Sequence, residues 1–198
     1  MSKKIILFSI ALAVTFGVAT QVEAKKRLKM TNYLFAYFIG NAPQEEQIHF
    51  AVSNDGFNYT PLNGGNPVIG SDSIALTKAV RDPHILRGED GSYFMVVTDM
   101  RSSLGWSSNR GIVLLHSKDL VHWTHRTVHF PEKYKGTHFA HVTRVWAPQT
   151  IYDKSVGKYM VYFSLLTDDG SIPYDRVYYC YANADFTDLE GEPQVLFD

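Results

Sequence analysis

One carboxylate in this sequence has a setting that favours chemistry. Asp82 directly precedes a proline in the stretch Arg81-Asp82-Pro83-His84-Ile85, at the expected start of a β-strand. Proline fixes the backbone there and lacks an N–H that the first residue of a strand need not use. The Asp82 side chain can therefore be held toward a cavity, where a carboxylate can exchange protons with a bound molecule. The ordinary alternative is an aspartate that caps a turn at the strand entry.

The stretch around this aspartate recurs later in the chain at a fixed offset. Pro83 and Pro148 are 65 residues apart, and Met95 and Met160 are again 65 residues apart. The second copy reads Trp146-Ala147-Pro148-Gln149 and has no acid before its proline. We interpret the proline as a requirement of the scaffold in both copies, and the acid as a separate requirement in the first copy alone.

A second set of landmarks has nearly the same period. The motifs Ser53-Asn54-Asp55 and Ser117-Lys118-Asp119 are each followed by an aromatic residue four positions after the aspartate. A weaker third copy ends at Asp185, so that the three aspartates are separated by 64 and 66 residues. Repeats of fixed length are typical of stacked or radially arranged supersecondary units.

The segments between the landmarks have the composition of β-strands. Six short runs are rich in aromatic and β-branched residues and are bounded by Gly, Asn, Asp or Pro. These predicted strands are residues 33–39, 48–53, 92–98, 111–117, 158–164 and 177–181. Turn residues at 89–91 and 153–157 predict tight hairpins. No part of the chain after residue 24 keeps a 3.6-residue apolar period long enough to predict a long helix.

The repeat length predicts an all-β fold, and within that class a β-propeller. A unit of about 65 residues holds four strands with their turns, which is the size of a propeller blade with long loops. A β-sandwich would also have evenly spaced strands, but it has no reason to repeat its sequence. Residues 25–198 hold about 2.7 such units, whereas propellers typically close with four or more blades. The length therefore predicts a fragment or a truncated reading frame, with an exposed sheet edge where the next blade belongs.

The amino terminus is expected to be a targeting segment. Lys3 and Lys4 precede the apolar run 5–19, and Val22-Glu23-Ala24 offers small residues to a signal peptidase. The run is shorter than the roughly 18 apolar residues of a membrane span. We expect a signal peptide at residues 1–24, a secreted or periplasmic protein, and no membrane association after cleavage. The single cysteine, Cys180, is expected to be a small buried residue.

Composition and spacing argue against two classes of partner. The chain has 19 basic and 20 acidic side chains, so it lacks the positive charge that nucleic-acid binding needs. The eight histidines show no metal-ligand spacing with Cys or acidic residues. No nucleic-acid partner, no bound metal and no cofactor are expected.

The order of these motifs resembles glycoside hydrolase family 43. The resemblance spans about residues 31–198 and is carried by residues 80–85, 93–97, 117–123, 144–149 and 157–162. It implies a five-bladed β-propeller, of whose glycosidase domain residues 25–198 would be the N-terminal part. It also implies an inverting hydrolase of plant polysaccharides, with arabinofuranosides or xylosides as the usual substrates. Some relatives hold a structural calcium near the propeller axis, and nothing in this sequence reports on it.

The resemblance also implies a role for Asp82. In an inverting glycosidase one carboxylate deprotonates water, while a carboxylic acid about 6.5 to 9.5 Å away protonates the leaving oxygen. Asp82 matches the general base of the family. The family's acid, a Glu usually followed by Gly-Pro, and the Asp that tunes it normally lie beyond residue 198. Glu190 and Asp168 are interpreted as residues of a solvent-facing turn and a polar loop.

Six further residues are candidates for substrate contact. Trp106 and Trp146 could stack on a sugar ring, although Trp146 fits core packing equally well. Gln149 follows Trp-Ala-Pro where relatives often have Asp or His, and it keeps hydrogen bonding without charge. The remaining three supply polar groups, each with an ordinary salt-bridge or strand-capping explanation. The candidate substrate-binding residues are Arg81, His84, Trp106, Arg144, Trp146 and Gln149.

Two other functions stay open at this point. The 198 residues can be a non-catalytic remnant that at best binds carbohydrate, because loss of a general acid typically lowers the rate by 10² to 10⁴. Related five-bladed enzymes act on fructans or phosphorolyse mannosides, but they usually have different residues around the first acid. In each case the expected partner is an oligo- or polysaccharide.

Overall fold

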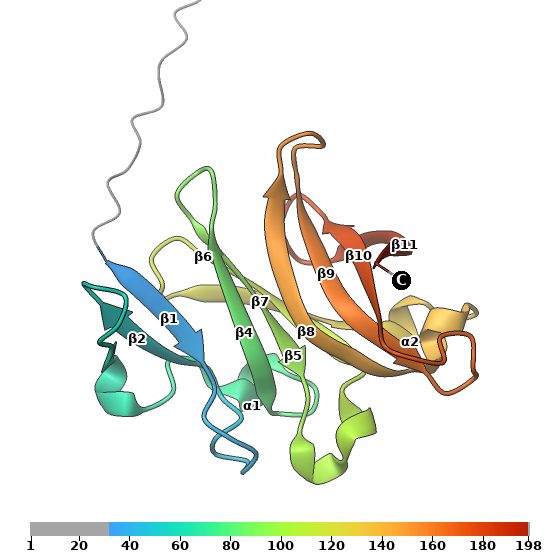
Figure 1. The fold of residues 1–198 in the computed structure, drawn as a ribbon, viewed down its shortest axis with the longest axis horizontal. Coiled ribbons are helices and arrows are strands. Elements are labelled where there is room, and N and C mark those ends of the chain that lie inside the picture. Colours follow the sequence, from blue (N-terminus) through green and yellow to red (C-terminus); the bar gives the residue numbers. More distant parts are fainter. Residues whose placement is uncertain (1–31, 198) are drawn as a thin grey trace, which may run out of the picture. The chain divides into compact units, whose positions relative to one another are not determined.

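The computed structural model describes residues 32–197. The signal peptide expected at residues 1–24 lies outside the described residues and stays a prediction. In the described part, eleven strands form three antiparallel sheets that follow one another in chain order, from blue β1 to red β11 in Figure 1. No helix of this part is long and apolar enough to cross a membrane.

Each sheet is built from strands that are consecutive in the sequence. The first sheet contains β1 (Tyr33–Tyr37), β2 (His49–Ser53) and β3 (Thr60–Pro61). The second contains β4 (Val80–Arg87), β5 (Tyr93–Asp99), β6 (Gly111–Ser117) and β7 (Trp123–His129). The third contains β8 (Val142–Asp153), β9 (Lys158–Thr167), β10 (Arg176–Ala182) and β11 (Leu189–Phe197).

The helices are single turns in the connections between strands. The two α-helices are α1 (Ser71–Ile74) and α2 (Phe130–Lys133). The 3₁₀ turns are η1 (Asn63–Gly65), η2 (Ser102–Leu104), η3 (Trp106–Ser108) and η4 (His138–His141). Short helices are what the sequence predicted, since no long amphipathic pattern was present.

The second sheet is buried on both faces, which makes it the centre of the core. Phe94 and Val96 of β5 point toward the third sheet and share a cluster of buried residues with Phe163 of β9. The alternate residues Met95 and Val97 belong to the cluster on the opposite face, where side chains of β1 pack. This two-sided burial follows from the period of two along a strand. Three sheets stacked in series are propeller blades rather than the two facing layers of a sandwich, so the predicted fold is confirmed.

The repeated serine and aspartate motifs form the same turn in two sheets. The Ser53 hydroxyl accepts from the Gly56 backbone N–H at 2.9 Å, and the Ser117 hydroxyl accepts from the Leu120 N–H at 2.9 Å. Ser53 ends β2, whereas Ser117 ends β6, the third strand of its sheet. By this correspondence β1 matches β5. Among the residues described, the first sheet therefore has no counterpart of β4 and β8, which are the first strands of the other two sheets.

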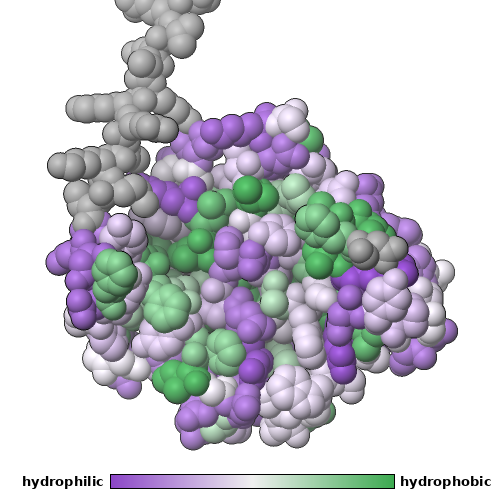
Figure 2. All heavy atoms as spheres, viewed as in Figure 1, coloured by the Kyte–Doolittle hydropathy of each residue, from purple (hydrophilic) through white to green (hydrophobic). Residues whose placement is uncertain are grey.

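The surface of these sheets alternates between polar and apolar areas. Figure 2 shows several separate apolar areas set among polar side chains on the face that Figure 1 presents. Large apolar side chains are exposed on each sheet, for example Phe35 on β1, Val121 between β6 and β7, and Ile151 on β8. Cys180 is buried and free, as expected.

Candidate functional site

Two equivalent backbone bulges lie on neighbouring strands, β4 and β8. In β4 the register passes from Arg81 opposite Thr98 to His84 opposite Val96, so two residues face one on β5. In β8 the same shift occurs between Trp146 and the residue three positions later. Asp82-Pro83 was expected at the start of a strand, but β4 begins at Val80 and the pair lies inside it. A bulge tolerates proline there because the bulged residue donates no ladder hydrogen bond.

The residue before each proline has a left-handed backbone. The φ angle is 51° at Asp82 and 44° at Ala147, a conformation that costs a non-glycine residue of the order of 1–2 kcal/mol. Strained backbone of this kind tends to occur at functional sites. Here the strain is present in both copies and the acid in only one. The bulge therefore belongs to the scaffold, and the carboxylate at position 82 is a separate feature.

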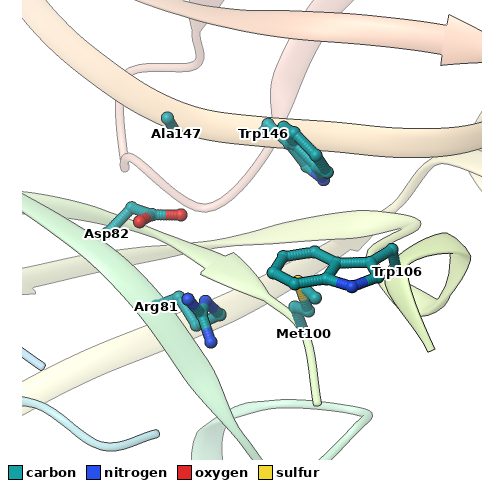
Figure 3. Close-up of a pocket in the computed structure, with 6 residues that line it drawn as sticks. All are labelled: Arg81, Asp82, Met100, Trp106, Trp146 and Ala147. Atoms are coloured by element: carbon teal, nitrogen blue, oxygen red, sulfur yellow. The ribbon is translucent and has the colours of Figure 1, made fainter. Parts of the chain in front are cut away.

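A cavity of about 220 Å³ opens between the two bulges. Its walls come from β4, β8 and the β5–β6 loop. In the view of Figure 3, two polar side chains lie on one side of the cavity and two indole rings with a thioether lie on the other. The residues that line it are Arg81, Asp82, Met100, Trp106, Trp146 and Ala147.

Thr98 connects the two bulges through one hydroxyl group. This fully buried residue of β5 donates to Asp82 Oδ2 at 2.9 Å. The same oxygen accepts from the backbone N–H of Ala147 at 3.1 Å. Because a threonine hydroxyl has one donor and accepting lone pairs, it can make both bonds at once. The Asp82 carboxylate is thus oriented by β5 and, through Thr98, by β8.

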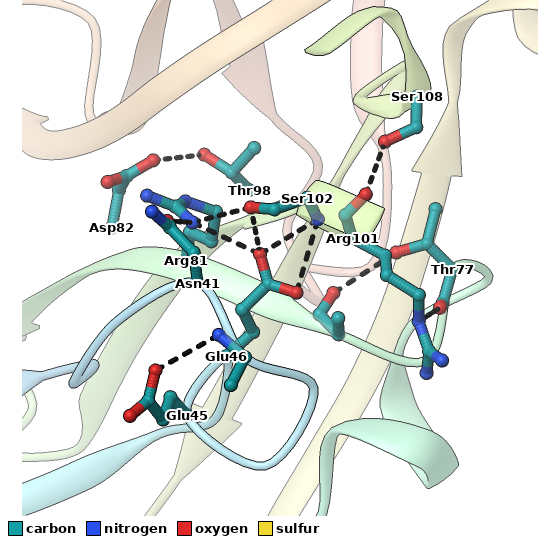
Figure 4. Close-up of polar contacts among 12 residues, drawn as sticks. Asn41, Glu45, Glu46, Thr77, Arg81, Asp82, Thr98, Arg101, Ser102 and Ser108 are labelled. Carbon is teal, nitrogen blue, oxygen red and sulfur yellow. Dashed lines mark hydrogen bonds and ion pairs between the residues drawn. The ribbon is translucent and has the colours of Figure 1, made fainter. Parts of the chain in front are cut away.

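Arg81 is held beside Asp82 by a buried carboxylate. Its Nη1 lies 3.0 Å from Glu46 Oε1, and it also donates to Asn41 and Ser102 (Figure 4). The guanidinium carbon lies 4.5 Å from the ring centre of Phe38. A guanidinium fixed in this way can present its remaining N–H groups to a ligand in the cavity.

The two cavity tryptophans contact each other edge to face. The ring centres of Trp106 and Trp146 are 6.1 Å apart with an interplanar angle of 61°. Figure 3 shows the nitrogen edge of Trp146 turned toward Trp106, and the buried Nε1 atom has no hydrogen-bond partner in the described part of the chain. An N–H group directed at an aromatic ring explains this arrangement. Trp106 is 54% exposed, so one ring is available for stacking on a sugar.

Three predicted substrate-binding residues lie beside the cavity rather than in its lining. The guanidinium of Arg144 lies 4.7 Å from the ring centre of Trp146 and pairs with Asp175 at 3.2 Å. His84 accepts at Nδ1 from the Thr150 N–H at 3.3 Å, and burial lowers its pKa. His84 therefore joins β4 to β8 as a neutral ring.

Gln149 is exposed and takes part in a contact within the third sheet. Its side-chain oxygen accepts from the Tyr162 hydroxyl at 2.6 Å. Glu190 lies in β11 and pairs with Lys158, so it faces solvent as expected but belongs to a strand rather than a turn. Asp168 lies 3.7 Å from His141 on the surface. Asp82 is therefore the one carboxylate that lines the cavity within residues 32–197.

The described residues form no group of three His, Cys, Asp or Glu that could hold a metal ion. Within this part of the molecule the cavity offers one carboxylate and one guanidinium as charged groups. The chemistry that these residues can perform is proton transfer and hydrogen bonding to a neutral, ring-shaped ligand that also stacks on tryptophan.

Comparison with known families agrees with this geometry. A family model described as a probable glycosyl hydrolase domain, related to glycoside hydrolase family 43, matches residues 29–198. The chain belongs to this family. The resemblance seen in the sequence motifs is thereby confirmed, and the family 43-related domain includes the cavity and both bulges.

One curated relative and several solved structures are similar to the family 43-related domain. An α-L-arabinofuranosidase of Bifidobacterium longum subsp. longum is 29% identical over 208 residues, which cover 93% of this chain and 19% of that protein. A glycosyl hydrolase structure from Bacteroides ovatus superposes with a TM-score of 0.57 at 18% identity, over 86% of this chain and 49% of that one. An α-L-arabinofuranosidase from Lactobacillus brevis gives 0.53 at 12% identity, over 84% and 50%.

An exo-β-1,3-galactanase from Phanerochaete chrysosporium has the same fold, with a TM-score of 0.53 at 12% identity over 84% of this chain and 36% of that one. The family 43-related domain thus spans about half or less of the length of each of these proteins. At these identities the structural matches report the fold.

Several residues of the site were not predicted from the sequence. Thr98 was included only as the last residue of a strand, and Glu46 lies in a polar stretch that has no motif. Met100 lines the cavity because it directly follows β5. Only the 65-residue repeat could have pointed to Ala147, since it occupies the position equivalent to Asp82.

Proposed function

We propose that this chain provides the general-base part of a glycoside hydrolase site that cleaves arabinofuranoside or xyloside linkages of plant polysaccharides with inversion. One observation carries the proposal. Asp82 lines a cavity next to two tryptophans and is oriented by the buried hydroxyl of Thr98. A carboxylate fixed at the wall of a sugar-sized cavity is suited to remove a proton from water.

The proposed chemistry assigns a task to each wall of the cavity. Asp82 takes a proton from a water molecule, which then attacks the anomeric carbon from the side opposite the leaving oxygen. The exposed ring of Trp106 offers a stacking surface for a sugar ring. Arg81 donates to sugar hydroxyl groups through the N–H groups that Glu46 leaves free. An inverting site also needs an acid, and the described part of the chain supplies none to this cavity, so the whole enzyme would provide it from elsewhere.

The substrate class rests on the family relationship. The similar protein from Bifidobacterium longum is an α-L-arabinofuranosidase, which supports an arabinofuranoside as the first substrate to test. Xylosides are the second usual substrate that the family resemblance implies. Structures with the same fold include galactanases, so a galactan belongs in the same screen.

A second candidate function is carbohydrate binding without turnover. It is favoured by the single carboxylate in the cavity lining, because an inverting reaction needs two. The stacking ring and the guanidinium would still bind sugar in that case.

The decisive experiment uses substrates that differ in their need for an acid. A 2,4-dinitrophenyl arabinofuranoside has a leaving group that departs without protonation, so it tests the base alone. We expect the chain to hydrolyse it, and Asp82→Asn to lower the rate by about 10² or more. Asp72→Asn, at an exposed carboxylate of α1, is the matched control and should leave the rate unchanged.

The outcomes separate the two candidates. Equal rates for Asp82→Asn and the unmodified chain would contradict the role of Asp82 as base. Binding of arabinan or xylan oligosaccharides with no release of dinitrophenol would favour the non-catalytic function. NMR of the first sugar released reports the anomer, and retention of configuration would exclude the inverting mechanism.

We also propose that the protein is exported. Support comes from Lys3, Lys4 and the apolar run that follows them. Mass spectrometry of the protein from a culture supernatant or periplasm would check for a new amino terminus after Ala24, and an uncleaved cytoplasmic chain would contradict export.

A further inference from the structure

We infer that Glu46 is a positioning residue of the cavity, which fixes Arg81 and the loop that carries Trp106 relative to each other. The inference rests on the proposal above that the cavity binds sugar. Glu46 does not line the cavity, so it acts through the two groups that do.

Glu46 is a buried charge whose oxygens are fully used. Its side chain is 0% exposed, and a carboxylate in that position is tolerated only when it is paired and hydrogen-bonded. It accepts from Arg81 Nη1 at 3.0 Å and from the Ser102 backbone N–H at 2.9 Å (Figure 4). The Ser102 hydroxyl is a further donor to the same oxygen. Its main chain is also fixed, because the Val80 N–H donates to the Glu46 carbonyl at 3.0 Å.

The first group that Glu46 holds is the guanidinium of Arg81. The three hydrogen bonds of this side chain all use Nη1. Within residues 32–197, Nε and Nη2 have no hydrogen-bond partner, and Arg81 lines the cavity. The Glu46 pair therefore determines which edge of the guanidinium faces the ligand.

The second group is the loop between β5 and β6. Ser102 begins η2, and Trp106 begins η3 four residues later. Arg101 is tied to the backbone as well, since it donates to the carbonyls of Thr77 and Lys78 at 2.8 and 2.9 Å. Glu46 thus fixes the start of the loop from the side of the first sheet. The ring of Trp106 lies 5.7 Å from the Arg81 guanidinium, and this separation depends on a carboxylate that bonds to both segments.

Asp99 provides a matched control for a purely structural carboxylate. It is 2% exposed and accepts from the backbone N–H groups of Leu76 and Thr77 at 3.0 and 2.9 Å. Both acids are buried and both hold a turn by backbone hydrogen bonds. They differ in that only Glu46 bonds directly to a cavity residue.

The experiment compares Glu46→Gln with Asp99→Asn in the 198-residue chain. The ¹⁵N indole signals of the three tryptophans are assigned with single Trp→Phe variants. We expect Glu46→Gln to shift the signals of Trp106 and Trp146 and to leave that of Trp123, whose Nε1 donates to the Leu120 carbonyl in another turn. Asp99→Asn should leave all three signals in place while lowering the melting temperature. An unmoved Trp106 signal in folded Glu46→Gln would overturn the inference.

A second variant covers the case in which Glu46→Gln does not fold. Ser102→Ala removes the hydroxyl donor and keeps the pair of Glu46 with Arg81. It should still shift the Trp106 signal, and an unchanged signal would count against the inference.

Titration with arabino-oligosaccharides gives a readout that a structural role alone would not change. We expect binding about tenfold weaker in Glu46→Gln, since small misplacements of binding groups reduce productive contact, and unchanged binding in Asp99→Asn. If the unmodified chain binds no sugar, the proposed function fails, while the indole signals still decide the role of Glu46.

Discussion

The hydroxyl of Thr98 should couple the stability of the fold to the carboxylate of Asp82. Thr98→Val keeps the shape of the side chain and its preference for a strand. It removes the donor to Asp82 Oδ2 and the acceptor for the Ala147 N–H. Thr98→Ser keeps both bonds and loses one methyl group, so it is the matched control.

The size of the effect follows from the two bonds. A hydrogen bond to a charged group contributes about 1.5–3 kcal/mol, and a neutral one about 0.5–1.5 kcal/mol. Both groups border the cavity, where water can replace part of the loss, so the lower ends apply. We expect Thr98→Val to lower the free energy of unfolding by about 2 kcal/mol. In a domain of this size that corresponds to roughly 4–8 °C in melting temperature.

A double-mutant cycle in urea isolates the bond to the carboxylate. Asp82→Ala removes the acceptor and leaves a residue that position 147 already tolerates in the same conformation. If the bond exists, Thr98→Val should cost about 1.5 kcal/mol less in the Asp82→Ala background. Additive effects, within about 0.5 kcal/mol, would show that Thr98 does not orient Asp82.

Three more expectations concern backbone strain and titration. Ala147→Gly should raise the free energy of unfolding by about 0.5 kcal/mol, because glycine adopts a positive φ without strain; a lower melting temperature would contradict this. Burial raises the pKa of the Cys180 thiol to about 11, so only about one thiol in a thousand is ionised at pH 8. A disulfide reagent should therefore label it only on unfolding, and fast labelling of the folded chain would refute the burial. Burial lowers the pKa of His84 from 6.5, so below that pH the unfolded chain binds a proton that the folded chain does not. Stability should fall as the pH drops below about 6.5, and His84→Gln should reduce this slope; an unchanged slope would argue against it.

The fold was predictable because its signals are local and repeated. All six predicted runs are strands, and residues 111–117 coincide with β6. The 65-residue offset between Pro83 and Pro148 became two bulges with the same register shift. The number of units, about 2.7, also agrees with the two four-stranded sheets and one three-stranded sheet of residues 32–197.

The site was less predictable because its contacts join residues that are distant in the sequence. Glu46 and Ser102 are 56 positions apart, and neither lies in a motif. His84 and Gln149 have residue types that suit sugar binding, but their side chains contact Thr150 and Tyr162. Side-chain direction at a bulge departs from strict alternation, so the position of Gln149 after Pro148 did not determine which way it faces.

The paired bulges separate the geometry of the site from its chemical content. The same backbone shape carries an acid at position 82 and a methyl group at position 147. Since the conformation is maintained by register and proline, single substitutions at these two positions can change the charge and size of the cavity wall without rebuilding the strands beneath. Such a socket is a natural starting point for altering the selectivity of the protein by design.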